Sequence, residues 1–321
     1  MTPPPLELSP PDLQRYRDTD TGVAYVHRFD SGRPGPVVMV QALTHGNELC
    51  GAIALDWLFR TGLGRSWLPL QGRLIVSFAN VAAYERFDAA QPFASRCVDE
   101  DLNRVWDDAV LFGPRDSVEL RRARELQPFI DSADYLLDIH SMQEACRPLM
   151  LCGPLERTAR WARQLGTPAN LLLDAGHAAG RRLRDRGGFA DPDSPRQALL
   201  IECGQHWERR SVDVAIDTLL RFLQLTGVQD SGWVSQGPRL PLPPAQQLIR
   251  VDRAITARSE QFRFLVPAHS LDVIPAAGTP IAQDGETVIR TEHAHTVLVM
   301  PSRLPPQPGQ TMVRLGTYAP M

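Results

Sequence analysis

A histidine and a glutamate stand three residues apart at the end of an apolar run, in VVMVQALTHGNELCG at residues 37–51. His45 and Glu48 therefore lie where a buried strand is expected to pass into a helix, and at such a junction both side chains can turn toward one point. Imidazole and carboxylate groups together suit zinc. On its own, the same spacing also describes a helix start that carries a surface acid.

Two further apolar runs end in ionisable residues. His140 closes YLLDIH (135–140), and Glu202 lies near the end of ALLIECG (198–204). A lone histidine after a strand is usually structural, but here two histidines follow two apolar strands at their exits. Glu202 follows residues that are too apolar to tolerate an unpaired carboxylate. It is either the first residue of a polar loop or a general base beside a metal-bound water.

The stretch SRCVDEDLNRVW at residues 95–106 concentrates polar groups. It places Arg96, Asp101, Asn103 and Arg104 within nine residues, which a buried aliphatic face would not require. The alternative interpretation is a solvated loop with scattered charge. Asparagine occurs only four times in the chain, and three of these residues fall inside the motifs, which modestly favours function: Asn47, Asn80 and Asn103.

Alternating strands and helices are expected to position these residues. The expected strands cover 37–43, 73–80, 135–140, 147–153 and 198–204, and the expected helices cover 48–62, 117–133 and 211–227. This alternation predicts an α/β fold with a mostly parallel sheet flanked by helices. Ligands bind beyond the carboxyl ends of such strands, so one shared site is expected to collect His45, Asn80, His140 and Glu202.

The composition changes after residue 230. A linker rich in Pro, Gly and Gln is expected at about 231–247, and short alternating apolar runs punctuated by Gly and Pro follow it. The sequence therefore predicts a catalytic α/β domain at 1–230 and a small C-terminal all-β domain at 248–321. A length of 321 residues agrees with more than one domain.

Charge and composition argue against several classes of protein. The chain has 34 basic residues, all arginine, and 37 acidic ones, and its net charge of −3 offers no basic field for nucleic acid or anionic lipid. The N-terminus lacks the pattern of a signal peptide, and no apolar run is long enough to span a membrane. Five cysteines without a CxxC pair predict free thiols in a reducing cytoplasm.

The motifs in their order resemble a known family. HGNE, then NV…R…DLNR, then DIH and then IECGQ are similar to the motifs of the succinylglutamate desuccinylase and aspartoacylase family, which is related to the zinc carboxypeptidases. The resemblance runs over roughly residues 35–225, and the β-rich tail is similar to the C-terminal domain of the same family. It implies a zinc-carboxypeptidase-like fold and one Zn²⁺ per chain.

The resemblance also implies roles for individual residues. The matched zinc ligands are His45, Glu48 and His140, and the matched catalytic glutamate is Glu202. Arg96 stands seven residues before Asn103, where the family has the arginine that faces the scissile carbonyl. Asn103 and Arg104 match the pair that grips the substrate carboxylate. Asp101 matches a residue that hydrogen-bonds the first zinc histidine.

Two segments depart from the family pattern. Residues 176–197, upstream of Glu202, have the sequence GHAAGRRLRDRGGFADPDSPRQ. Arg186 and Arg196 are the candidates in this segment for a second contact to a substrate carboxylate, and the sequence leaves open whether either of them makes it. The residues after His140, SMQEACRP, differ as well. The acyl group and the amino acid of the substrate therefore stay open.

The expected activity is that of a cytoplasmic zinc-dependent amidohydrolase that removes the acyl group from a small N-acyl amino acid. A metallocarboxypeptidase acting on short peptides would use the same groups and stays open as an alternative, as does assembly into a homo-oligomer. A zinc-binding protein without catalysis is disfavoured, because ligand binding requires neither Glu202 nor Arg96. The remaining histidines are expected to be structural or at the surface: His27, His177, His206, His269, His293 and His295.

Overall fold

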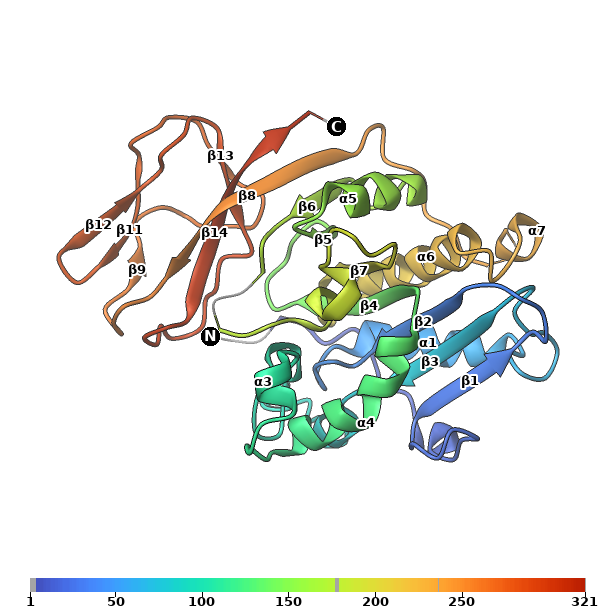
Figure 1. Cartoon of the computed structure of the whole chain (residues 1–321). Coiled ribbons are helices and arrows are strands. Elements are labelled where there is room, and N and C mark those ends of the chain that lie inside the picture. The colour runs from blue at the N-terminus through green and yellow to red at the C-terminus, as the bar shows by residue number, and fades with distance from the viewer. Residues whose placement is uncertain (1–3, 177–178, 236, 321) are drawn as a thin grey trace.

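The computed structural model describes residues 4–176, 179–235 and 237–320. An 11-stranded sheet, in the order β1-β3-β2-β4-β7-β5-β6-β8-β14-β13-β10, runs through the molecule (Figure 1). Its strands are β1 (Val26–Asp30), β2 (Val37–Ala42), β3 (Arg73–Phe78), β4 (Tyr135–Met142), β5 (Leu149–Gly153), β6 (Asn170–Leu173), β7 (Gln197–Gln205), β8 (Gln247–Thr256), β10 (Val273–Ile274), β13 (Thr296–Val299) and β14 (Thr311–Ala319). A second sheet has the order β12-β11-β9, formed by β9 (Arg263–Phe264), β11 (Pro280–Asp284) and β12 (Thr287–Arg290).

The centre of the large sheet is parallel, as predicted. β3, β2, β4 and β7 pair in parallel, which brings their carboxyl ends to one edge of the sheet. The five predicted strands are present as β2, β3, β4, β5 and β7, and each end differs from the prediction by at most two residues. The sheet is nevertheless mixed, because β5 runs antiparallel to β7 and β1 runs antiparallel to β3. The sequence analysis did not identify β1 or β6.

Helices cover both faces of the sheet. α1 (Leu49–Arg60), α5 (Glu156–Ala162) and α6 (Arg209–Leu225) pack on the face to which Val38 and Val40 point. α3 (Asp108–Leu111) and α4 (Val118–Ser132) pack on the opposite face, with Met39. Alternate side chains of the buried strand β2 thus pack into two separate hydrophobic cores, one on each face of the sheet, which explains its continuous apolar run. The three predicted helices are present as α1, α4 and α6.

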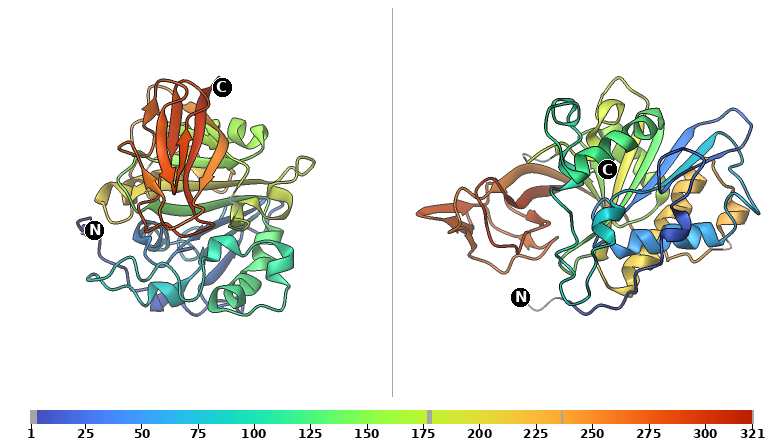
Figure 2. Two further views of the ribbon diagram at one scale, coloured as in Figure 1. Left: turned by 90° about the vertical axis from the view of Figure 1, so that its left-hand side faces the viewer. Right: turned by 90° about the horizontal axis from the view of Figure 1, so that it is seen from below.

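The C-terminal strands continue the large sheet. After the short helix α7 (Ser231–Val234), residues 237–246 contain no helix or strand, and β8 then pairs in parallel with β6. From Gln247 to Ala319 the regular elements are strands, and the outermost of them project from the rest of the molecule (Figure 2). The division into domains at 1–230 and 248–321 stays a prediction, since the sheet itself crosses the expected boundary.

Two predictions from composition concern the whole chain. All five cysteines are free thiols, as the sequence analysis expected: Cys50, Cys97, Cys146, Cys152 and Cys203. In the part of the chain that the structure describes, the helices lack the length and apolar character that a membrane crossing requires.

Candidate active site

His45 and Glu48 lie in the turn between β2 and α1, as the sequence predicted. The turn begins at Leu43, whose φ of 60° is in the left-handed region and marks a sharp change of direction after the strand. Glu48 is the N-cap residue of α1, but its side chain makes no capping hydrogen bond. Its Oε1 lies instead 2.7 Å from His45 Nδ1, so the carboxylate faces the histidine.

Gly46 is required by the packing of this turn. A Cβ atom at Gly46 would lie 2.4 Å from the backbone of Ala83 and 2.5 Å from the carbonyl oxygen of Ser95. The amide of Gly46 also donates to the carbonyl oxygen of Arg96 at 3.1 Å. Because no side chain fits there, the glycine of the HGNE motif lets the turn approach the loop that carries Arg96.

His140 reaches the same point from β4. Its Nδ1 lies 3.0 Å from Glu48 Oε2, in a contact that lacks the angle of a hydrogen bond. Its Nε2 lies 2.8 Å from Oδ2 of Asp138, which is fully buried and also accepts a hydrogen bond from Thr44 at 2.9 Å. The sequence analysis did not single out Asp138. Its signal was its position two residues before His140, which places both side chains on one face of a strand.

The donor atoms of His45, Glu48 and His140 fit a metal ion. One ligand atom from each residue lies within 4.8 Å of the others, and all three residues are buried. In both histidines Nδ1 faces Glu48 while Nε2 contacts a carboxylate, Asp101 or Asp138. That pairing orients a metal-ligating imidazole and increases its basicity. Two nitrogens and one carboxylate are a donor set that zinc accepts.

The electrostatics of this group call for positive charge. Burial alone would raise the pKa of Glu48, but the charges of His45 and His140 outweigh it and hold that pKa well below its usual value. Burial alone would lower the pKa of His140, but Asp138 and Glu48 raise it well above its usual value. The buried carboxylates of Glu48 and Asp138 therefore favour a positive charge at this point.

Glu202 stands beside the three candidate ligands. It lies on β7, where it is the register partner of His140 on β4. The side chain is buried, and its Oε2 has no hydrogen-bond partner among the described residues. The pKa of Glu202 is raised to about 8, mainly by burial and also by the charge of Glu48, against the opposing charges of His140 and Arg96. A carboxylate with this pKa can take up and release a proton near neutral pH.

The loop at 96–104 brings a cation to the histidine turn. Asp101 Oδ1 lies 2.8 Å from His45 Nε2, which is the contact that the sequence analysis expected. Arg96 donates to Asp101 Oδ2 at 2.8 Å and has NH1 3.9 Å from Glu48 Oε1. Burial alone would raise the pKa of Asp101, but the charges of His45 and Arg96 hold it well below its usual value. Asp101 therefore links the histidine to the arginine as an ionised carboxylate.

Asn103 and Arg104 follow in the same loop and line the same pocket. The Asn103 Oδ1 accepts a hydrogen bond from the Leu183 amide at 2.9 Å, so the amide Nδ2 is the group left to donate to a ligand. Arg104 donates to the Asn103 carbonyl at 2.7 Å. Gly180 lets the chain pass over Arg104, because a Cβ at its φ of +138° would lie 2.2 Å from the Arg104 carbonyl oxygen.

Glu119 on α4 anchors this loop, a role that the sequence analysis missed. Its carboxylate accepts hydrogen bonds from the backbone amides of Val98, Asp99 and Glu100 at 2.7, 3.0 and 3.2 Å. It also accepts one from Asn80 Nδ2 at 3.0 Å. Asn80, expected in the shared site, instead caps α2 (Val81–Tyr84) and holds Glu119. Asn80 does not line the pocket, so that part of the prediction is wrong.

The candidate site opens into a pocket of about 510 Å³. All eight residues proposed from the sequence line this pocket. It is also lined by residues that the sequence analysis did not single out, among them Arg182, Arg314, Met300, Leu304, Gln307 and Gln310. Neither Arg186 nor Arg196 lines the pocket. Arg186 is held away by a bidentate pair with Asp131, at 2.7 and 2.9 Å.

Two buried arginines supply cationic groups that the sequence did not reveal. Arg182 pairs with Asp174 and with Asp185, so its charge is balanced. Arg314 comes from β14, where its Nε lies 3.4 Å from Asp174 Oδ2 without forming a hydrogen bond. It was not recognisable from the sequence, because it is more than 100 residues from every motif and lies in a strand expected to belong to another domain.

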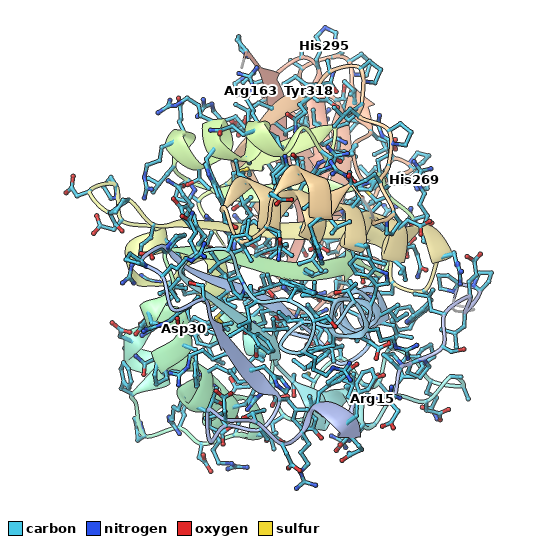
Figure 3. The ribbon with its side chains drawn as sticks, turned by 90° about the vertical axis from the view of Figure 1, so that its right-hand side faces the viewer. Arg15, Asp30, Arg163, His269, His295 and Tyr318 are labelled. Atoms are coloured by element: carbon cyan, nitrogen blue, oxygen red, sulfur yellow. The ribbon has the colours of Figure 1, made fainter. Side chains whose placement is uncertain are left out.

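Among the histidines that the structure describes, His206 is the one outside the motifs that reaches the pocket. It is 1% exposed and lines the pocket. Burial lowers its pKa to about 3, so the imidazole is neutral at physiological pH. His269, His293 and His295 are exposed, as expected, and Figure 3 shows His269 and His295 at the periphery of the molecule. His177 lies outside the described residues.

Comparisons with known proteins agree with the motifs. No curated protein matches the chain. Solved structures of similar fold include the succinylglutamate desuccinylases of Chromobacterium violaceum (18% identity, TM-score 0.64, 94% of this chain and 90% of that one) and of Vibrio cholerae (18%, 0.63, 89% and 82%). The product-bound ectoine utilization protein EutE of Ruegeria pomeroyi is also similar (15%, 0.59, 88% and 86%). At these identities the likeness shows a common fold, while the link to zinc carboxypeptidases stays a prediction.

A family model provides the assignment itself. The model of the succinylglutamate desuccinylase/aspartoacylase catalytic domain matches residues 34–224, which is more than half of the chain. That range contains the turn with His45 and Glu48, the loop with Arg96 and the strands that carry His140 and Glu202. The chain belongs to the succinylglutamate desuccinylase/aspartoacylase family.

Proposed function

We propose that this protein is a zinc-dependent amidohydrolase that removes the acyl group from an N-acyl amino acid. Membership of the family indicates a deacylase-type hydrolase. The proposal adds the metal, the substrate class and the roles of individual residues. The observation that carries it is the pairing of Glu202 with His140, which sets a proton-accepting carboxylate beside three converging ligand atoms.

His45, Glu48 and His140 would hold the metal. Zinc bound by three protein ligands keeps a position open for water and lowers the pKa of that water to about 7. Asp101 and Asp138 support this arrangement, since they fix the two imidazole rings through Nε2.

Glu202 would move the proton. It accepts a proton from the attacking water on a carboxylate oxygen and later delivers it to the nitrogen of the leaving amine. The carbon–oxygen bond forms as water attacks, and the carbon–nitrogen bond breaks as the amine leaves with that proton. Its unpartnered Oε2 and its position beside the candidate metal ligands support this role.

Arg96 and the pair Asn103–Arg104 would divide two tasks. Arg96 lies beside the turn that carries His45, where it forms ion pairs with Asp101 and Glu48. It would donate a hydrogen bond to the carbonyl oxygen of the scissile amide as negative charge develops there. Arg104 would bind the carboxylate of the amino acid through its planar fork, and Asn103 would add an amide donor.

Crowding of arginines supports an anionic substrate. The pKa of Arg104 is lowered to about 10, mainly by burial and also by the charges of Arg96, Arg314 and Arg182, against the opposing charge of Asp101. A bound carboxylate would relieve this repulsion between like charges. Arg314 is placed to extend the same anionic subsite, because its Nε is buried without a hydrogen-bond partner in the described chain.

A peptidase is the alternative, and the C-terminal strands argue against it. Met300, Leu304, Gln307 and Gln310, all from that part of the chain, line the pocket beside the candidate catalytic residues. A pocket walled in this way suits a compact acyl group better than an extended peptide. A non-catalytic zinc protein would have no use for Glu202. A cytoplasmic location and assembly into a homo-oligomer stay predictions.

A release assay tests the proposal. The zinc-loaded protein is incubated with a panel of N-acetyl, N-succinyl and N-formyl amino acids and with short peptides, and the liberated amine is measured. We expect hydrolysis of acyl amino acids, loss of activity after chelation and recovery with zinc. Preferential hydrolysis of peptides would replace the proposal by the peptidase, and activity that survives complete removal of metal would overturn the role of zinc.

A further inference from the structure

His206 lies beside the proposed reaction centre without a role in the scheme above. It follows β7 directly, four residues after Glu202, and its backbone amide donates to the Met142 carbonyl at 2.8 Å. The next residue, Trp207, donates from its indole to the carbonyl of Asn47 at 3.1 Å. His206 is thereby tied both to the end of β4 and to the turn between His45 and Glu48.

One ring nitrogen of His206 forms a hydrogen bond, and the other forms none with the described residues. Nδ1 lies 2.8 Å from the hydroxyl of Ser141, the residue after His140. Nε2 is buried and has no hydrogen-bond partner among the described residues, although the side chain lines the pocket. A buried polar atom without a partner destabilises a protein, so an unpaired nitrogen on a side chain that lines a pocket points to contact with a ligand.

Ser141 can fix which nitrogen of His206 carries the proton, because its hydroxyl can either donate to Nδ1 or accept from it. If its hydroxyl donates to Nδ1, the proton of the neutral ring is on Nε2, and His206 presents a donor to the pocket. The first arrangement complements a carbonyl oxygen, which accepts hydrogen bonds. The opposite tautomer would turn a lone pair toward that oxygen and could not bind it.

We propose that neutral His206 donates a hydrogen bond from Nε2 to the carbonyl oxygen of the scissile amide, and that Ser141 is the positioning residue that fixes this tautomer. The inference rests on the proposed function and adds a second protein donor to Arg96 at the oxygen where negative charge develops. A neutral donor stabilises this charge without repelling the metal and the guanidinium that share the site.

Steady-state kinetics of zinc-loaded variants test this role. His206→Leu removes the donor and should lower kcat by about 10²- to 10³-fold with little change in KM. His206→Gln keeps an N–H donor and should recover part of that loss. Ser141→Ala leaves the imidazole but frees its tautomer, so its kcat should fall by a smaller factor. His27→Leu, at a half-buried histidine that does not line the pocket, should match wild type.

Metal content and melting temperature are measured for each variant, so that turnover is expressed per bound zinc. If His206→Leu turns over within threefold of wild type, or if its loss of activity follows a loss of zinc, the inference is wrong. A fall confined to KM would also overturn it, because it would place His206 on a part of the substrate that does not change during the reaction.

Nitrogen-15 NMR of the zinc-loaded protein gives a readout that does not depend on turnover. The spectrum should show His206 neutral with its proton on Nε2, and Ser141→Ala should shift the population toward the other tautomer. A proton on Nδ1 in the wild type would overturn the inference even if the protein is an active deacylase. If the wild type hydrolyses no substrate of the panel, the proposed function fails and this inference falls with it.

Discussion

The Cα atoms of His140 and Glu202 are paired across the parallel strands β4 and β7. Register partners project their side chains from the same face of a sheet, so a proposed metal ligand and a proposed general base are neighbours because of strand pairing. A shift of one residue in this register would turn Glu202 to the opposite face of the sheet. The chemistry of the site is therefore coupled to the central sheet.

Metal binding should depend on both histidines. His45→Ala and His140→Ala should each lose most of the zinc, because a site with only two protein ligands binds it far more weakly. The side chain of His293 is 60% exposed, and His293→Ala should keep full occupancy. Elemental analysis of the purified proteins measures the zinc-to-chain ratio. Full occupancy in both active-site variants would show that the ligands are elsewhere.

Glu202→Gln should separate metal binding from chemistry. The amide has the shape of the carboxylate but cannot accept the proton, so the variant should keep its fold and zinc while kcat falls by ~10²-fold or more. Circular dichroism, zinc content and kcat on the same preparation check this. Turnover close to wild type would remove Glu202 from the mechanism.

The two arginines of the 96–104 loop should affect different kinetic constants. Arg104→Ala removes a contact present throughout the reaction and should act mainly through KM. Arg96→Ala removes a donor that gains strength as charge appears, and it should lower kcat by ~10²- to 10³-fold with little change in KM.

Acid and amide forms of one substrate provide the control for Arg104. Conversion of the substrate carboxylate to an amide should harm the wild type far more than it harms Arg104→Ala. If the variant discriminates between the two forms as strongly as the wild type does, Arg104 does not bind the carboxylate.

Glu119→Gln should loosen the loop that carries Arg96 and Asp101. The variant replaces an acceptor of several amide hydrogen bonds by a group with fewer acceptor sites, and hydrogen bonds to charged groups are worth about 1.5–3 kcal/mol each. We expect unfolding free energy to fall by about 3 kcal/mol, and kcat to fall with it. Urea denaturation measures the first effect. Glu125→Gln, at an exposed position of the same helix, should change stability by less than about 1 kcal/mol.

Asp174→Asn should reveal a pH-dependent contribution to stability. Burial alone would raise the pKa of Asp174, but the charge of Arg182 outweighs it and holds that pKa below its usual value. Such a group stabilises the fold above its unfolded pKa, and this stabilisation is lost as pH falls through the lower folded pKa.

The variant should therefore be less stable than wild type by about 3 kcal/mol near neutral pH, because buried Arg182 keeps only Asp185 as a partner and buried Arg314 loses the carboxylate beside it. The difference should stay constant down to about pH 4 and shrink below it. Denaturation curves at several pH values measure this. A difference that is independent of pH down to the acid transition would show that ionised Asp174 is not its source.

Local patterns in the sequence already determined the main strands, the main helices and the residues of the motifs. Apolar periodicity depends on neighbouring residues, so β2, β4, β7, α1, α4 and α6 were predictable to within two residues. The break from apolar to polar residues at His45, His140 and Glu202 likewise lies within three residues of a strand end, and it can be recognised without any knowledge of the neighbouring strands.

Only the tertiary structure decided which distant residues meet. The antiparallel direction of β5, the pairing of β8 with β6, the anchoring of the loop by Glu119 and the entry of Arg314 all join segments far apart in the chain. The local sequence around these residues is ordinary. From it, Glu119 would be predicted to lie on the exposed face of a helix, and Arg314 would be predicted to be solvated. Such contacts follow from how the whole chain packs and from the burial of charge that packing imposes, and no local pattern records either.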